Sequence, residues 1–279
     1  VLAAANGDFF MTGTGIPIGL VVTDGVMRSS DAKQNAIGFL PENRDTDGIF
    51  FNLPISQNIT IRNLPKISRF RLIRGNMEHL ESMDIIDRFG IDTPDGSTRI
   101  SHLSGGNKQK TIVGRNVFSN SSIFVFDEPT KGIDVGTKSE IYKLMRGLAD
   151  RGIGVIVVSS EMTELLGLCD RIAVMYAGKI VETGTAEDIF YRPKHPYTQA
   201  LLKSLPTVET SREEKLVSIA GTPPDLFMPP KGCEFASRCE HCMKVCKKHV
   251  PPTYEVGAGH KAVCWRLHPA CPAQSKEGN

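Results

Sequence analysis

The sequence predicts an α/β fold, in which crossover helices join the strands of a parallel sheet, followed by a loop-rich region. Continuous apolar runs such as 123–126, typical of buried parallel strands, alternate with helical periodicities such as that of 141–148. The content of 40% hydrophobic and 23% charged residues is that of a globular chain. Past residue 190 the periodicity fades, prolines are frequent, and six of the seven cysteines gather between Cys233 and Cys271.

Composition excludes several classes of protein. The 279 residues favour two domains, and no apolar run approaches the roughly 18 residues that a membrane-spanning helix needs. The net charge is +2, and residues 191–279 carry 13 basic and 8 acidic residues; this mildly basic tail suits a membrane-proximal position or an anionic cofactor, but solvated surface is the favoured interpretation. Because Val1 is not methionine and no charged segment precedes an apolar stretch, we expect an incomplete or processed chain without a signal peptide.

The first hundred residues predict strands and then a helical insertion. Residues 16–25 indicate a pair of strands ending in an Asp-Gly turn, and 36–40 indicate a short strand. Residues 45–102 predict a small helical subdomain inserted into the α/β body. Within it, the apolar periodicity indicates a helix that Asn76 caps and Gly90 ends.

The following segment alternates regularly between strands and helices. Strands are predicted at 123–126, 153–158 and 172–176. The helices between them are predicted along the apolar positions of 141–148 and at 161–168. Such alternation is typical of a parallel sheet with crossover helices.

Two adjacent carboxylates follow the first of these strands. Asp127 and Glu128 come directly after the apolar run 123–126, at the strand end where ligands bind in parallel sheets. Asp127 is suited to hold Mg²⁺, directly or through water, and Glu128 is suited to polarise an attacking water. The alternative is a strand followed by an acidic turn without function.

A glycine-rich helix start lies about 20 residues before that strand. Ser104, Gly105 and Gly106 precede a helix that contains Gln109, and exposed N–H groups at such a position bind anions. An ordinary helix cap with flexible glycines is the alternative. This segment is followed by the Asp-Glu strand and then by the tripeptide Gly-Ile-Asp, which ends at Asp134. The ordered combination of the three is a specific signal.

These motifs resemble those of the ATP-binding subunits of ABC (ATP-binding cassette) transporters. Leu103–Gln109 is similar to the family's signature motif, Ile123–Glu128 to its Walker B strand and Gly132–Val135 to its D-loop. Gly38–Arg44 resembles the Q-loop region. The resemblance implies a P-loop-NTPase-like ABC cassette with a helical subdomain, which uses ATP and Mg²⁺.

Different parts of the chain resemble different branches of that family. Residues 12–175 resemble the second cassette of monosaccharide importers, including Glu42 in place of the usual glutamine and Ser160 in place of the switch histidine. Residues 178–268 resemble the extension of oligopeptide/dipeptide importer ATPases. We therefore expect a partial nucleotide-binding domain at 1–190 and a peptide-importer-type extension at 191–279; a hybrid lineage and a fusion both stay open.

The phosphate-binding loop of this family, Gly-x-x-x-x-Gly-Lys-Ser/Thr, does not occur in the sequence. Residues 132–139 miss the pattern because Thr137 separates Gly136 from Lys138. We expect a chain truncated just after the loop, with Val1–Ala5 at the end of its helix, and we expect residues 1–279 to be inactive alone. A natural lack of the loop is the alternative.

Four cysteines form a second candidate site. The spacing Cys233-x5-Cys239-x6-Cys246-x17-Cys264 resembles that of peptide-importer tails, some of which carry a [4Fe–4S] cluster. Four thiolates also suit structural zinc, and free thiols are a third alternative, whereas cytosolic disulfides are disfavoured. The spacings exceed the Cys-x2-Cys of zinc knuckles and favour iron–sulfur in a structural or redox-sensing role.

The resemblance implies an ATPase subunit of an importer, at the cytoplasmic face of the cell membrane as a peripheral protein. Two cassettes would sandwich ATP, with Ser104, Gly105 and Gly106 on the partner's nucleotide, while Asp127 and Glu128 serve the chain's own. The other residues implied around nucleotide are Glu42, Gln109, Asp134 and Ser160. The implied partners are a second ATPase subunit, a membrane permease docked on residues 45–102 and, indirectly, a periplasmic or lipoprotein solute-binding protein. Nucleic acid is not an implied partner.

Three other functions stay open. The tail is the rarer feature and favours peptide as the solute, but a sugar importer is an alternative. The missing loop, Glu42 and Ser160 also fit a non-catalytic partner that lends its signature motif to another subunit. A soluble cassette acting on ribosomes or DNA is disfavoured by the peptide-type tail.

Overall fold

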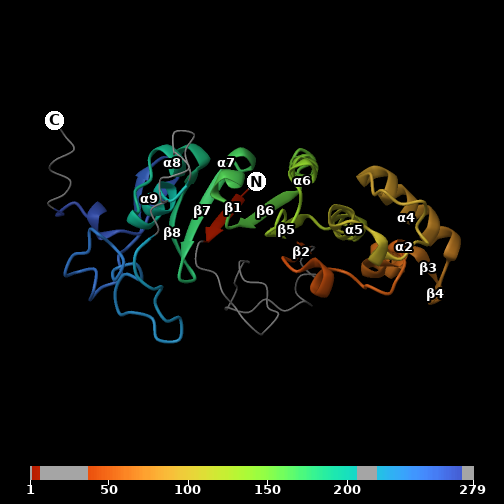
Figure 1. The fold of residues 1–279 in the computed structure, drawn as a ribbon, viewed down its shortest axis with the longest axis horizontal. Helices are drawn as coiled ribbons and strands as arrows, with labels where there is room; N and C mark the ends of the chain where they lie inside the picture. Colours follow the sequence, from red (N-terminus) through yellow and green to blue (C-terminus); the bar gives the residue numbers. More distant parts are fainter. Residues whose placement is uncertain (1, 7–36, 206–218, 272–279) are drawn as a thin grey trace. The chain divides into compact units, whose positions relative to one another are not determined.

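The computed structural model describes residues 2–6, 37–205 and 219–271 (Figure 1). Two compact units divide the chain near residue 158; Leu2–Asn6 belongs to the second unit. The strand pair expected at 16–25 lies outside the described residues. The structure contradicts the expected helix end at the amino terminus, because Leu2–Asn6 forms strand β1.

A parallel three-stranded segment forms the sheet of the first unit. Its strands are β2 (Ile37–Leu40), β5 (Ile123–Asp127) and β6 (Gly154–Ser159), with β5 in the middle. The apolar run of β5 is almost completely buried, as expected of a central parallel strand. The predicted α/β class is confirmed, and the observed strand bounds lie within one residue of those predicted.

Two longer helices of the first unit connect these strands. Helix α5 (Gly105–Phe118) comes before β5, and α6 (Val135–Ala149) lies between β5 and β6 (Figure 1). Both helices have an oxygen-bearing side chain at the amino-terminal cap, from Ser104 and Asp134 respectively. The helix starts therefore lie immediately beside the predicted motifs.

The segment between β2 and α5 is mostly helical, as predicted. It contains α2 (Ile55–Thr60), α3 (Leu64–Ile67) and α4 (Gly75–Phe89), and a short hairpin of β3 (Ser68–Arg69) and β4 (Leu72–Ile73). Helix α4 ends at Gly90, whose φ of 56° is the left-handed conformation that glycine favours. It begins before the predicted cap Asn76, because Arg74 occupies the cap position.

The strands of the second unit pair in both parallel and antiparallel directions. Strand β1 pairs in parallel with β7 (Arg171–Tyr176), which pairs antiparallel with β8 (Lys179–Thr185). Further out, β10 (His260–Ala262) pairs with β8 and with β9 (Tyr254–Gly257). Its helices are α7 (Met162–Leu168), α8 (Ala186–Tyr191) and α9 (Pro196–Lys203). No helix in 2–6, 37–205 or 219–271 has the length and apolarity of a membrane span.

The loop-rich tail has a small core that sequence periodicity did not reveal. Phe235 is buried, with its ring centroid 5.2 Å from that of Tyr176 and 5.4 Å from that of Tyr197. Glu182 of β8 accepts hydrogen bonds from the backbone N–H groups of Lys194 and His195, at 2.7 and 2.9 Å. Aromatic packing and one buried carboxylate thus tie the tail to β7, β8 and α9.

Candidate functional site

The two predicted carboxylates lie at the carboxyl end of β5. Asp127 is the last residue of the strand and is in register with Val158 of β6, whose carbonyl accepts the N–H of Glu128 at 2.8 Å. Glu128 has a φ of 45°, a costly conformation for a non-glycine residue that is common at functional sites. Two strands therefore fix the backbone of both carboxylates.

A third carboxylate belongs to the same edge. Glu42 follows β2, the other neighbour of β5, and its Oε1 lies 2.6 Å from Lys131 Nζ. Burial raises the pKa of Asp127 to about 6, with smaller contributions from the charges of Glu42 and Glu128 that Lys131 partly offsets. The edge is thus short of positive charge, a condition that a bound cation would relieve.

This acidic edge is not a complete metal site by itself. No group of three or more His, Cys, Asp or Glu side chains that could hold a metal ion occurs in the described ranges. Mg²⁺ commonly takes only one or two carboxylates from a protein, and its other ligands are water and substrate phosphates. The donor set of Asp127 and its neighbours therefore fits Mg²⁺ that arrives with a nucleotide.

The glycine-rich helix start is built from close contacts within the first unit. Ser104 Oγ accepts hydrogen bonds from the N–H and side-chain amide of Asn107, at 3.5 and 3.1 Å. A Cβ on Gly106 would lie 2.4 Å from Cγ2 of Thr137 in α6, and one on Gly105 would lie 3.0 Å from Arg44 Nη2. Glycine at these positions lets the starts of α5 and α6 and the segment after β2 approach one another.

Gln109 and Asp134 have structural partners. Gln109 is 1% exposed, and its side-chain amide donates to the carbonyl of Pro129, in the turn after the carboxylates. Asp134 accepts from the N–H and hydroxyl of Thr137, at 2.9 and 2.8 Å, and these hydrogen bonds lower its pKa. Their predicted contacts with nucleotide stay predictions.

Ser160 belongs to the second unit, immediately after β6. It is exposed, and its neighbour Ser159 donates a 2.6 Å hydrogen bond to Glu164 of α7. The structure thus gathers Glu42, Asp127 and Glu128 with the two helix starts in one unit, while Ser160 is described within the other.

Two basic residues of the site were missed by sequence reasoning. Arg44 Nη1 donates to the carbonyl of Lys131 at 3.2 Å, and Lys131 pairs with Glu42. Arg44 ends the Q-loop-like segment and Lys131 precedes the D-loop-like one, but nothing in the sequence indicates that residues 87 positions apart meet. Their contact depends on the parallel pairing of β2 and β5.

The four predicted cysteine ligands converge in the second unit. The side chains of Cys233, Cys239, Cys246 and Cys264 line one small cavity, and the N–H of Cys233 donates to the carbonyl of Cys246 at 2.7 Å. Burial raises the pKa of Cys233 to about 12 and that of Cys264 to about 11, with smaller contributions from neighbouring thiols. These raised pKa values favour the neutral thiol at Cys233 and Cys264.

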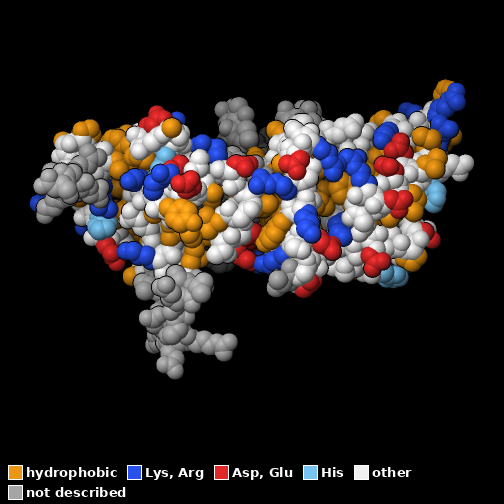
Figure 2. All heavy atoms as spheres, turned by 90° about the horizontal axis from the view of Figure 1, so that it is seen from above, with side chains coloured by type: hydrophobic (Ala, Val, Ile, Leu, Met, Phe, Trp, Pro, Cys, Tyr) orange, Lys and Arg blue, Asp and Glu red, His pale blue; other side chains and the backbone are white. Residues whose placement is uncertain are grey.

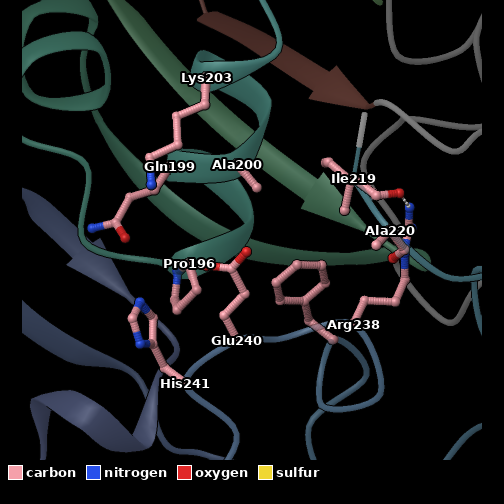
Figure 3. A pocket seen from close by; sticks show the side chains of 10 residues that line it. Pro196, Gln199, Ala200, Lys203, Ile219, Ala220, Arg238, Glu240 and His241 are labelled. Carbon is pink, nitrogen blue, oxygen red and sulfur yellow. Dashed lines mark hydrogen bonds between the residues drawn. The ribbon is translucent and has the colours of Figure 1, made fainter. Parts of the chain in front are cut away.

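A separate cavity of about 240 Å³ lies between α9 and the tail (Figure 3). Gln199 and Lys203 line it from the helix, and Arg238, Glu240 and His241 from the tail. Arg238 is already occupied, since it donates to the carbonyls of Ile219 and Ala220 at 2.9 and 3.0 Å. The remaining charges have both signs, so the cavity selects no one class of ligand.

Comparisons with known proteins agree with these motifs. Residues 181–246 match the family model described as the C-terminal region of the oligopeptide/dipeptide transporter. The oligopeptide transport ATP-binding protein OppD of Bacillus subtilis is 40% identical over 194 residues, which cover 68% of this chain and 54% of OppD. The ribose import ATP-binding protein RbsA 2 of Burkholderia cenocepacia is 43% identical over 161 residues, covering 57% of this chain and 32% of RbsA 2.

The fold is also found among solved structures. A metal-chelate type ABC transporter in an inward-facing conformation is similar with a TM-score of 0.50 and 18% identity, over 61% of this chain and 64% of that one. The predicted cassette fold and the resemblance to both importer branches are thus confirmed. The chain spans about half the length of the peptide-transport relatives that it matches.

Proposed function

We propose that this chain, which is homologous to the ATP-binding subunits of ABC transporters, couples ATP hydrolysis to the import of peptides. The observation that carries the ATPase proposal is the pair Asp127 and Glu128 at the carboxyl edge of β5, which two neighbouring strands hold in place. Peptide is favoured over sugar as the solute because the match at 181–246 belongs to the peptide-transport branch, while the sugar-type relative is covered to only 32%.

The proposed chemistry divides the work between these two carboxylates. Asp127 would hold the cation that accompanies ATP. Burial and, to a lesser extent, the charges of Glu42 and Glu128 raise the pKa of Asp127, and a bound cation would favour its ionised form. Mg²⁺ would supply charge stabilisation on the phosphate oxygens. Glu128 orients and polarises the attacking water, from a backbone position that its hydrogen bond to Val158 fixes.

The proposed assembly is a head-to-tail pair of cassettes. Ser104, Gly105 and Gly106 of one subunit contact the nucleotide that the second subunit holds, through N–H groups at the start of α5. A membrane permease docks on the helical subdomain at 45–102, so the chain works at the cytoplasmic face of the membrane. A solute-binding protein delivers the peptide to the permease.

Residues 1–279 alone are proposed to lack measurable ATPase activity. The sequence contains no Gly-x-x-x-x-Gly-Lys-Ser/Thr, so the loop amides and the lysine that cradle the phosphates are missing. Steady-state phosphate release by the purified chain tests this statement, and hydrolysis by a monomer would contradict it.

The decisive variant is Glu128→Gln in a version of the chain that carries a phosphate-binding loop. It should bind ATP as the parent does and hydrolyse it at least ~10²-fold more slowly, the usual scale for loss of a general base. Glu140→Gln is the matched control, because Glu140 is a glutamate of α6 that pairs with Lys110 away from the carboxylate edge. Near-parental hydrolysis by the Glu128 variant would remove this residue from the mechanism.

One observation favours a second candidate, a non-catalytic partner subunit. The family's usual glutamine is replaced by Glu42, whose carboxylate is tied to Lys131 at 2.6 Å. In this case a loop-bearing chain would stay inactive alone yet stimulate a catalytic subunit, and Ser104→Arg would abolish the stimulation. Phosphate release by the chain alone and by the mixture separates the two candidates.

We further propose that Cys233, Cys239, Cys246 and Cys264 hold a [4Fe–4S] cluster. Support comes from the small cavity that all four side chains line and from their spacing in the sequence, which resembles that of peptide-importer tails. Their x5 and x6 spacings in the sequence exceed the Cys-x2-Cys of zinc knuckles, which favours iron–sulfur over zinc. Arg266 beside Cys264 would offset part of the thiolate charge.

Anaerobic purification tests the cluster. We expect a brown protein with about four iron atoms per chain and absorbance near ~400 nm, as thiolate-bound iron gives. Cys242→Ser is the matched control, because Cys242 is a tail cysteine that does not line the cavity. Colourless protein with one zinc per chain would move the assignment to zinc, and metal-free protein would leave free thiols.

A further inference from the structure

The β3–β4 hairpin of the helical subdomain exposes large apolar side chains. Phe70, Leu72 and Ile73 are 85%, 73% and 52% exposed, and every residue from 69 to 76 is exposed. Ile67 at the base is 1% exposed, and its carbonyl accepts the N–H of Arg74 at 3.0 Å. The hairpin is therefore anchored at its base, while its tip exposes apolar side chains whose contact with water is unfavourable.

The same hairpin carries only positive charge. Arg69, Arg71 and Arg74 alternate with the apolar residues, and no acidic residue occurs between Asp47 and Glu78 in the sequence. None of these three arginines takes part in an ion pair among the described residues, whereas nearby Lys66 pairs with Glu81. Figure 2 shows blue and orange side chains gathered on a projection at the end of the molecule where Figure 1 labels β3 and β4.

The turn is not the one that stability alone would select. Phe70 and Arg71 have φ values of 49° and 66°, as in the two-residue turns for which Asn-Gly is strongly preferred. A bulky aromatic and an arginine are poor choices at positive φ. The guanidinium of Arg69 lies 5.2 Å from the centroid of the Phe70 ring, so charge and aromatic surface are presented together.

We propose that this hairpin, residues 68–73 with Arg74, docks on the surface of an anionic lipid bilayer. Its apolar tip fits the boundary between head groups and acyl chains, and its arginines fit the negative head groups. We favour lipid over an acidic protein surface because the bilayer boundary takes up apolar side chains and arginines together without a matching pocket. The contact is independent of ATP hydrolysis and adds a direct lipid attachment to the proposed permease contact.

Flotation of the full chain with vesicles tests the proposal. We expect binding to vesicles of phosphatidylcholine mixed with phosphatidylglycerol, little binding to phosphatidylcholine alone, and weakening at high salt. Arg69→Gln/Arg71→Gln/Arg74→Gln should bind about 100-fold more weakly, at roughly fivefold per arginine. The control, Lys231→Gln/Lys247→Gln/Lys248→Gln, removes three exposed charges from the tail and should bind as the parent does.

A second variant separates lipid binding from folding. Phe70→Asn/Arg71→Gly installs the preferred turn, so it should keep or raise the melting temperature while it loses vesicle binding. Parental vesicle binding by either hairpin variant would overturn the proposal. A folded parent chain that does not bind anionic vesicles would also overturn it. That result would assign the hairpin to a protein partner instead.

Discussion

The carboxylate edge of the first unit and the cysteine cavity of the second are built in opposite ways. Asp127, Glu128 and Glu42 follow neighbouring parallel strands, and their charges are crowded at the edge of a sheet. The four cysteines come from loops, and burial raises the pKa values of Cys233, Cys239 and Cys264. A sheet places charge at its edge with few residues, whereas a loop-built site depends on particular close contacts between backbone segments.

The largest expected loss of stability comes from a substitution in that loop-built site. A Cβ on Gly232 would lie 2.1 Å from the carbonyl oxygen of Cys246, and backbone atoms cannot rotate away. Gly232→Ala should therefore destabilise the tail by about 3 kcal/mol, the upper end of the usual cost of overpacking, as the midpoint and slope of urea unfolding would show. Gly167→Ala in α7 has open space around its Cβ and should be neutral or stabilising by up to about 1 kcal/mol; equal losses in both variants would refute the packing explanation.

The second effect is a pH dependence of the tail. Burial lowers the pKa of His195 from 6.5 to about 4, so the folded state binds this proton less readily than the unfolded state. The stabilisation is present above pH 6.5 and is lost as the pH falls to about 4, with a total of about 3 kcal/mol. His195→Asn keeps an acceptor at the cap of α9 and should flatten the profile of unfolding midpoint against pH; an unchanged slope would exclude His195.

The carboxylate edge should respond to pH with the opposite sign. The pKa of Asp127 is raised from 3.8 to about 6, so its folded state holds the proton more tightly, and stability falls as the pH rises through this window. At pH 7, Asp127→Asn should stabilise the first unit by about 1–2 kcal/mol after allowance for solvent screening. Hydrogen exchange of the amides in β5 measures this gain in stability. Faster exchange in the Asp127→Asn variant would show that the negative charge of Asp127 is already balanced in the folded state.

The smallest effect concerns the helix start that borders the edge. Ser104→Ala removes the acceptor of the Asn107 N–H and side-chain amide, at a cost of about 1 kcal/mol. Thermal unfolding measures this change, and Ser104→Asp, which keeps a capping oxygen, should recover most of it. A cost above about 3 kcal/mol would indicate that the hydroxyl has a further partner.

The contrast between the regions also explains what the sequence could predict. Apolar runs such as that of β5 and the order of the motifs predicted the parallel sheet and both carboxylates, because these signals lie within a few adjacent residues. The contacts of Arg44 with Lys131 and of Phe235 with Tyr176 were not predicted, since they join residues far apart in the chain. Residues 1–5 were expected at the end of a helix because the order of motifs in the resembled family places the phosphate-binding loop and its helix before them, whereas pairing with β7 makes Leu2–Asn6 a strand.

The most direct measurement is the mass in solution of a loop-bearing chain with Glu128→Gln, with and without Mg²⁺ and ATP. If the carboxylate edge of one chain and the Ser104–Gly106 segment of another share a nucleotide, ATP should convert the monomer to a dimer that light scattering detects. Ser104→Arg in the same background should stay monomeric, because it places a bulky side chain in the shared site. A chain that stays monomeric with bound ATP, or that dimerises equally without it, would contradict the shared nucleotide site.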